Sequence, residues 1–352
     1  MRQIGLLIAL LFTGSNFAAA QTDERRDNSD MLRLVEPIAA KAKGSVVQVL
    51  SRRPAYPPNA SGRENAAGRS DQTWTPVALG TVVAEDGYVL TKRSELSGDP
   101  IRVRLSDGRL VPARVSAVRR QNDLAMLRIE GDVTLSPVEF ATNVPPTASF
   151  LVSVGRTGRP LGIGVVGVNK ARPVGHQGRL GVLLQDDVDG RALVNDVVEK
   201  SGADQAGIVP GDLIVAINGR EENTRRQVID RLRGMFPGER VRLTILRSND
   251  SKGLDTLEVD ALIRDMTILR ESASDTMVNG PRNTRLSGFD RVIQHDTVLD
   301  RAQCGGPLLD SLGRVVGINI ARAGRVVTYA LPSELLLPEL LSMLEESRAA
   351  SR

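Results

Sequence analysis

The sequence predicts a mostly β protein that carries an α+β module inside its second half. Between residues 77 and 129, short apolar and β-branched runs alternate with turn dipeptides such as Asp86-Gly87 and Asp107-Gly108. Two more β-rich stretches follow at 149–168 and 315–330, and strand and helix patterns mix in the long segment between them. Regular short strands with tight turns are typical of a barrel or sandwich, so we expect a compact domain inserted into a β-barrel host.

The first 20 residues have the pattern of a secretory signal peptide. Arg2 precedes an apolar run from Ile4 to Phe12, and alanines at 18–20 offer a small-residue cleavage site. A short membrane anchor is the alternative, but the run falls well below the roughly 20 residues that span a bilayer. We therefore expect a secreted or periplasmic protein, located in the cell envelope after cleavage and without a stable membrane span.

Local patterns place the remaining elements in order. Apolar residues at near-helical spacing predict a helix within 30–43, ahead of a strand at 46–50, and the residues of 52–71 are typical of a long loop. In the inserted segment, Asn223 is a plausible N-cap for a helix that ends near Gly234, and a further helix is expected over 333–346.

Composition excludes several classes of function. Cys304 is the only cysteine, so no disulfide can form within the chain. The net charge of +4 comes from arginines scattered among acidic residues, and aromatic residues make up only 3% of the chain. Because a nucleic-acid surface needs a basic cluster and aromatic platforms, we expect no nucleic-acid partner. We also expect no metal and no cofactor.

Three motifs in order resemble the HtrA/Deg branch of the trypsin-like serine proteases. They are Gly80–Thr91 before the base position, Asn122–Arg128 around the aspartate, and Cys304–Leu308 at the nucleophile. Supporting matches lie at Val292–Gln294, Val316–Asn319 and Tyr329–Ser333. The resemblance implies two trypsin-like barrels, which we place at 30–140 and, discontinuously, at 141–173 and 264–346. It also implies a possible homotrimer.

The inserted segment, 174–263, resembles a PDZ domain. The resemblance is carried by Arg179–Val182, Ser201–Gly207, Pro210–Ile214 and Ile217–Gly219. It implies a groove for polypeptide or protein C-termini, in which the loop residues Arg179, Leu180, Gly181 and Val182 hold the terminal carboxylate. Val228 and Leu232 are expected to line the pocket for an apolar C-terminal side chain.

The catalytic positions depart from the family pattern. Ser94 stands at the base position, where a hydroxyl cannot shuttle a proton near neutral pH. Cys304 replaces the nucleophilic serine, and Ala302 replaces the oxyanion-hole glycine, where a side chain disfavours positive φ. Position 123 keeps the aspartate of the family's catalytic triad. A buried aspartate there could equally have a structural role, in which it accepts hydrogen bonds from backbone N–H groups or from a neighbouring serine.

The two histidines offer no obvious replacement base. His176 falls in the linker to the PDZ segment, and His295 aligns with the specificity-pocket side of the second barrel, where we expect it at the surface or lining a pocket. The leading hypothesis is an inactive protease homologue that binds polypeptide through the PDZ groove, with the vestigial cleft as a second candidate site. The alternatives are an active endopeptidase that uses Cys304 and a purely structural envelope protein.

Overall fold

The computed structural model describes residues 30–52, 74–96, 100–172, 178–249, 253–270, 273–280 and 282–350. The expected signal peptide, most of the 52–71 loop and His176 lie outside these residues. In the part that is described, no helix is both long enough and apolar enough to cross a membrane.

The first half of the chain forms a closed six-stranded barrel. Its strands follow the order β1-β2-β3-β6-β5-β4. Gly87 and Gly108 have φ of +90° and +94° in the turns before β3 and β5, a conformation that glycine adopts without steric cost. The strands are β1 (Val46–Ser51), β2 (Thr75–Ala84), β3 (Tyr88–Lys92), β4 (Ile101–Arg104), β5 (Leu110–Arg119) and β6 (Leu124–Ile129).

The second barrel is also closed, and its strands come from two separate stretches of the chain. Its order is β17-β20-β19-β18-β7-β8. The barrel closes where β8 pairs with β17, for example at Ala171 and Val292, although the inserted module lies between them in sequence. The strands are β7 (Phe150–Val154), β8 (Pro160–Ala171), β17 (Val292–His295), β18 (Pro307–Leu309), β19 (Val315–Gly324) and β20 (Val327–Pro332).

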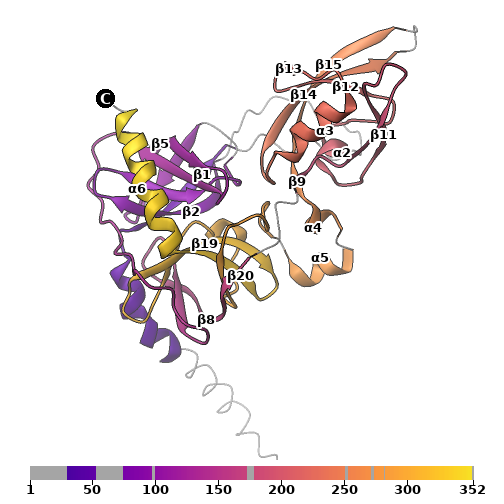
Figure 1. The fold of residues 1–352 in the computed structure, drawn as a ribbon. Coiled ribbons are helices and arrows are strands. Elements are labelled where there is room, and N and C mark those ends of the chain that lie inside the picture. The colour runs from indigo at the N-terminus through magenta and orange to yellow at the C-terminus, as the bar shows by residue number, and fades with distance from the viewer. Residues whose placement is uncertain are drawn as a thin grey trace, which may run out of the picture.

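The inserted module is a strand-and-helix lobe beside the two barrels (Figure 1). Its sheet has the order β10-β11-β12-β14-β15, so β10 lies at an edge, and β9 pairs separately with β16. The bounds are β9 (Gly178–Arg179), β10 (Val182–Asp186), β11 (Ala192–Val197), α2 (Gly202–Gln205), β12 (Leu213–Ile217), β13 (Arg220–Glu221), α3 (Arg225–Arg233), β14 (Arg240–Ser248), β15 (Leu254–Leu262) and β16 (Arg264–Asp265).

Helix α3 begins one residue later than Asn223 predicted. Thr224 is the N-cap: its hydroxyl accepts from the Gln227 N–H, and the Gln227 side chain accepts from the Thr224 N–H. Such a reciprocal capping box supplies acceptors for two backbone N–H groups that have no partner within the helix. Thr224 is therefore a more favourable N-cap than the residue before it.

Helices close the ends of the structure. A helix over 30–41 and α6 (Ser333–Ala349) pack on the barrels, and buried α6 residues such as Leu336 and Met343 join a core shared by both barrels. Short helices α4 (Met266–Leu269) and α5 (Ala273–Asn279) lead from the inserted module back to β17. The predicted mostly β fold with two barrels and an α+β insertion is confirmed.

Candidate functional site

Cys304, at the nucleophile position, is a buried thiol. It follows the 3₁₀ turn η1 (Arg301–Gln303), its exposed fraction is 0%, and its Sγ donates to Asn283 Oδ1 at 3.2 Å. Burial raises the pKa of the Cys304 thiol to about 12, and the nearby charge of Lys92 opposes this only in part. Since the thiolate is the nucleophilic form, Cys304 is held in its unreactive form at neutral pH.

Asp123 has both carboxylate oxygens occupied at the base position. Ser94 donates its N–H to Oδ1 at 2.9 Å and its hydroxyl to Oδ2 at 2.8 Å. Lys92, at the end of β3, places Nζ 2.6 Å from the same Oδ2, and both side chains of this ion pair are fully buried. The carboxylate that orients an imidazole in a working triad thus binds a hydroxyl and an ammonium.

Lys92 is not placed to replace the missing base. Its Nζ is engaged by the Asp123 carboxylate, and an ammonium has three donors and no acceptor. The ion pair with Asp123 therefore argues against a role for Lys92 as a base. The structure therefore brings Ser94 and Asp123 together as predicted, but adds a cation that sequence reasoning did not pair with them.

The oxyanion position is closed by the local turn. The Cys304 N–H donates to Arg301 O at 3.3 Å, and the Gly305 N–H donates to Asn319 O. Four non-glycine residues among those described have positive φ, and Ala302 is not one of them. Because these two N–H groups are bonded to carbonyls of the chain itself, they are not free to bind a substrate carbonyl.

His295 is a core residue, which corrects the expectation of a surface or pocket-lining position. Only 1% of it is exposed, Nδ1 lies 2.9 Å from Thr297 Oγ1, and Nε2 lies 3.0 Å from Asn319 Oδ1. Burial lowers the pKa of His295 to about 4, so the ring is neutral at pH 7. Both ring nitrogens are engaged by groups other than Cys304, which leaves the ring no free nitrogen to deprotonate the thiol.

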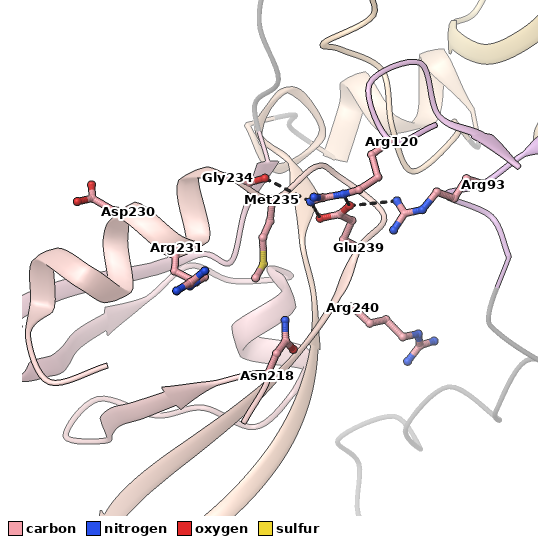
Figure 2. A pocket seen from close by; sticks show the side chains of 9 residues that line it. All are labelled: Arg93, Arg120, Asn218, Asp230, Arg231, Gly234, Met235, Glu239 and Arg240. Carbon is pink, nitrogen blue, oxygen red and sulfur yellow. Dashed lines mark hydrogen bonds and ion pairs between the residues drawn. The ribbon is translucent and has the colours of Figure 1, made fainter. Parts of the chain in front are cut away.

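The PDZ lobe lies directly against the base position. Gly238, in the turn before β14, has φ +86°, and a Cβ added to it would lie 2.4 Å from Ser94 Cβ. The next residue, Glu239, accepts from Arg120 at 2.6 and 2.7 Å and pairs with Arg93 at 3.2 Å (Figure 2). These contacts hold the lobe over Ser94, beside a polar cavity of about 500 Å³.

Arg285 joins the lobe to both barrels. It is fully buried, donates to the carbonyls of Arg120 and Gln121, and also donates to those of Ser287 and Gly288. Its guanidinium carbon lies 4.4 Å from the ring centre of Phe236 in the lobe and 4.8 Å from that of Phe289. Burial lowers the pKa of Arg285, yet carbonyls and aromatic faces compensate a buried guanidinium well. Nothing in the sequence pattern signalled this residue.

A groove of about 310 Å³ lies between β10 and α3. Leu180 and Gly181 turn their carbonyls into the lobe, where these accept from the N–H groups of Ala203 and Val198. In a planar trans peptide the following N–H points the opposite way, so those of Gly181 and Val182 point away from the lobe's interior. Gly181 has φ +93°, and a Cβ there would lie 2.1 Å from Ser201 Cβ, so this loop requires glycine.

The groove wall differs from the predicted one at a single helix position. Arg179, Leu180, Gly181, Val182 and Leu232 line it as expected, but Val228 is fully buried in the core of the lobe. Ile229, the next residue on α3, lines the groove instead. A rotation of about 100° between successive helical residues separates these two faces.

Comparisons with known proteins agree with this architecture. A family model described as a PDZ domain matches residues 160–258. A probable periplasmic serine endoprotease DegP-like from Hahella chejuensis is 25% identical over 52% of this chain and 56% of its own length. The periplasmic pH-dependent serine endoprotease DegQ of Escherichia coli is 24% identical over 59% of this chain and 63% of its own length.

The chain carries a PDZ domain and resembles the HtrA/Deg-type serine proteases. A DegP-like protein from Pseudomonas putida strain GB-1 extends the similarity to 80% of this chain, at 22% identity. The chain spans less than two thirds of the length of the first relatives it matches. The family resemblance inferred from the motifs is therefore confirmed, and the PDZ match begins within β8, ahead of the boundary predicted at 174.

Proposed function

We propose that this HtrA/Deg-type chain is a protease homologue without peptidase activity that binds polypeptide C-termini through its PDZ groove. The proposed lack of peptidase activity rests on the residues at the base position. There the Ser94 hydroxyl donates a hydrogen bond to Asp123, and Gly238 covers the Ser94 side chain. Loss of the base or the nucleophile in a serine protease costs about 10⁶ in turnover. Here both positions are altered.

The vestigial cleft is a poor second binding surface. Gly238 lies on Ser94, and the Glu239 and Arg285 contacts fix the lobe there. An imidazole is larger than the serine side chain, so a histidine at 94 would meet Gly238. We therefore do not propose that the protease-like cleft binds polypeptide. The PDZ groove is the one proposed peptide site.

Peptide binding by β-strand addition suits the groove. β10 is the edge strand, and the carbonyl directions of Leu180 and Gly181 imply outward N–H groups beside the Arg179 charge. Edge-strand addition supplies main-chain hydrogen bonds, while Leu180, Ile229 and Leu232 offer an apolar pocket. A peptide with a free C-terminal carboxylate and an apolar last residue is the ligand that this chemistry recognises.

We propose the cell envelope as the place of action, with a role in protein quality control or scaffolding. The relatives are named periplasmic proteases, and the first 20 residues carry the export pattern. Mass spectrometry of the chain recovered from the envelope fraction of an expressing bacterium should find Gln21 or a near neighbour at the N-terminus. Recovery of the exported protein with Met1 intact would contradict cleavage.

Titration of the full chain with labelled decapeptides tests the binding half. Peptides ending in a free leucine should bind, and their amidated counterparts should bind at least tenfold more weakly because the carboxylate is lost. Leu180→Glu should abolish binding by placing a carboxylate in the pocket, whereas Leu254→Glu, at an exposed residue of β15 that does not line the groove, is a charge-matched comparison. Equal binding of free and amidated peptides would refute carboxylate recognition.

A further inference from the structure

The cavity at the junction of the lobe and the first barrel has a surplus of positive charge. Its volume of about 500 Å³ lies in the range of small-molecule sites. The barrel supplies one wall, through residues that directly follow β3 and β5, and the lobe supplies the other (Figure 2). The charged lining residues are Arg93, Arg120, Arg231 and Arg240 against Asp230 and Glu239.

Glu239 is already engaged by two of these arginines. Its carboxylate accepts from Arg120 at 2.6 and 2.7 Å and lies 3.2 Å from Nη1 of Arg93. Burial alone would raise the pKa of Glu239, but the hydrogen bonds of Arg120 and the charge of Arg93 hold that pKa below its usual range, so the group is ionised. One negative charge thus faces two positive ones, and Arg93 has N–H donors beyond the contact through Nη1.

Asp230 does not balance the remaining charge. It points away from Glu239 and Arg240 (Figure 2), and 60% of its side chain is exposed. Its carboxylate lies 3.8 Å from Arg226 and 3.9 Å from Arg233, two arginines that are not part of the cavity wall. Exposed pairs of this kind are screened by water and salt. The interior of the cavity therefore stays positive.

Arg240, the first residue of β14, has no carboxylate partner among the described residues. Glu258 and Asp260 lie nearby and line a second cavity together with Arg240 and Arg242. These two carboxylates act on Arg242, whose Nε lies 3.2 Å from Asp260 and whose pKa is raised by Asp260 and then by Glu258. Arg240 is exposed and pairs with none of the residues drawn in Figure 2. Its guanidinium is thus available to a ligand.

Asn218 and Arg231 add donors on the lobe wall. Asn218 Oδ1 accepts from the Arg242 N–H at 2.9 Å, which fixes the amide with its nitrogen directed toward Met235 (Figure 2). Arg231 bonds Glu222 through Nε at 2.9 Å, so its Nη groups remain for a ligand. Donors on both walls, with the buried acceptor already engaged, suit a ligand rich in anionic oxygens.

We propose that this cavity binds a ligand that carries two linked phosphate groups, held by Arg93 on the barrel and by Arg231 and Arg240 on the lobe. Guanidinium groups bind phosphate through paired, charge-assisted hydrogen bonds. A phosphate presents three acceptor oxygens to arginines that come from different walls, whereas a carboxylate presents two in one plane. A volume of about 500 Å³ suits a diphosphate better than a single phosphate ion, which would leave most of the space to water.

The bound ligand links the lobe to the barrel, because its donors come from both walls. The proposal is independent of peptide binding and of peptidase activity. Linked phosphate groups occur in soluble diphosphates and in the headgroup of cardiolipin, and both sources present the same chemistry to the arginines.

Isothermal titration calorimetry of the full chain with inorganic diphosphate, phosphate and citrate tests the proposal. Diphosphate should bind at least about tenfold more tightly than phosphate, because it reaches more charged donors, and more tightly than citrate. Arg240→Gln should weaken diphosphate binding about tenfold or more. Arg226→Gln is the matched control, because it removes the same charge from an α3 residue that is 92% exposed and lies outside the cavity wall. It should change the affinity by less than about twofold.

Hydrogen exchange checks the link between the two walls. Bound diphosphate should slow exchange both directly after β3 and at the start of β14. Co-sedimentation with cardiolipin vesicles then separates the two sources. Sedimentation that diphosphate reverses and that Arg240→Gln abolishes would identify a lipid headgroup, whereas diphosphate binding without sedimentation would identify a soluble ligand.

Four results would overturn the proposal. They are no binding of diphosphate or of vesicles, equal affinities for diphosphate and phosphate or citrate, an equal loss in Arg226→Gln and Arg240→Gln, and protection confined to the lobe. Arg240 does not line the groove between β10 and α3, so Arg240→Gln should leave peptide binding unchanged. A failure of peptide binding therefore bears on the proposed function alone.

Discussion

The Cys304 thiol should resist alkylation in the folded chain. With a pKa of about 12, its thiolate fraction at pH 8 is about 10⁻⁴, whereas a solvated cysteine with a pKa near 8.5 is about one quarter ionised. The difference predicts labelling by iodoacetamide about 10³-fold more slowly than a model thiol. Complete burial slows it further, because reaction then requires local opening.

The assay is direct because the chain has one cysteine. Intact-mass spectrometry follows one alkylation event per molecule, and the same sample in denaturant supplies the fully reactive reference. Asn283→Ala, which removes the partner of the thiol, should accelerate labelling modestly by loosening its surroundings. A native rate within tenfold of the denatured rate would refute the protonated, inaccessible thiol.

Three further outcomes follow from buried titratable groups. Lys92→Met should destabilise the fold by about 3–5 kcal/mol because it leaves the Asp123 charge unpaired. Chemical denaturation should show that adding Asp123→Asn recovers part of this loss. If the changes in the free energy of unfolding of the two single variants simply add, the pairing is contradicted. His295 has a folded-state pKa of about 4 against the ordinary 6.5. Its neutral ring therefore contributes about 3 kcal/mol to the free energy of unfolding, in full above pH 6.5, and this contribution is lost as pH falls through 4. His295→Gln should flatten that part of the profile of stability against pH, and an unchanged slope would refute the shift. Glu239→Gln should raise hydrogen exchange in the turn it anchors, while Glu221→Gln, at an exposed residue, should not; equal exchange in both would discount the anchor.

Much of the fold was predictable because local chemistry and tertiary structure agree. Asp86-Gly87 and Asp107-Gly108 form the turns that their sequences favour, and the strands around them close a barrel. Strand β15, at 254–262, was not assigned, although Leu257, Val259 and Ala261 alternate with acidic residues as in a half-buried strand.

The site was predictable only where it depends on aligned motifs. The contact between Ser94 and Asp123 was expected from their motif positions. The ion pair of Lys92, the burial of His295 and the position of Arg285 arise from elements far apart in the chain. Such contacts depend on how strands close into barrels, which no local pattern encodes. The exchange of Val228 for Ile229 reflects a helical register that periodicity leaves uncertain by one residue.

Proteolysis of an unfolded protein is the most direct test of the proposed inactivity. Purified chain, incubated with a labelled casein-type substrate at neutral pH, should release no fragments above a buffer control, because position 94 has no group that can shuttle a proton. Cys304→Ala should behave identically. Steady turnover by the unaltered chain that Cys304→Ala abolishes would contradict the account and establish Cys304 as a working nucleophile.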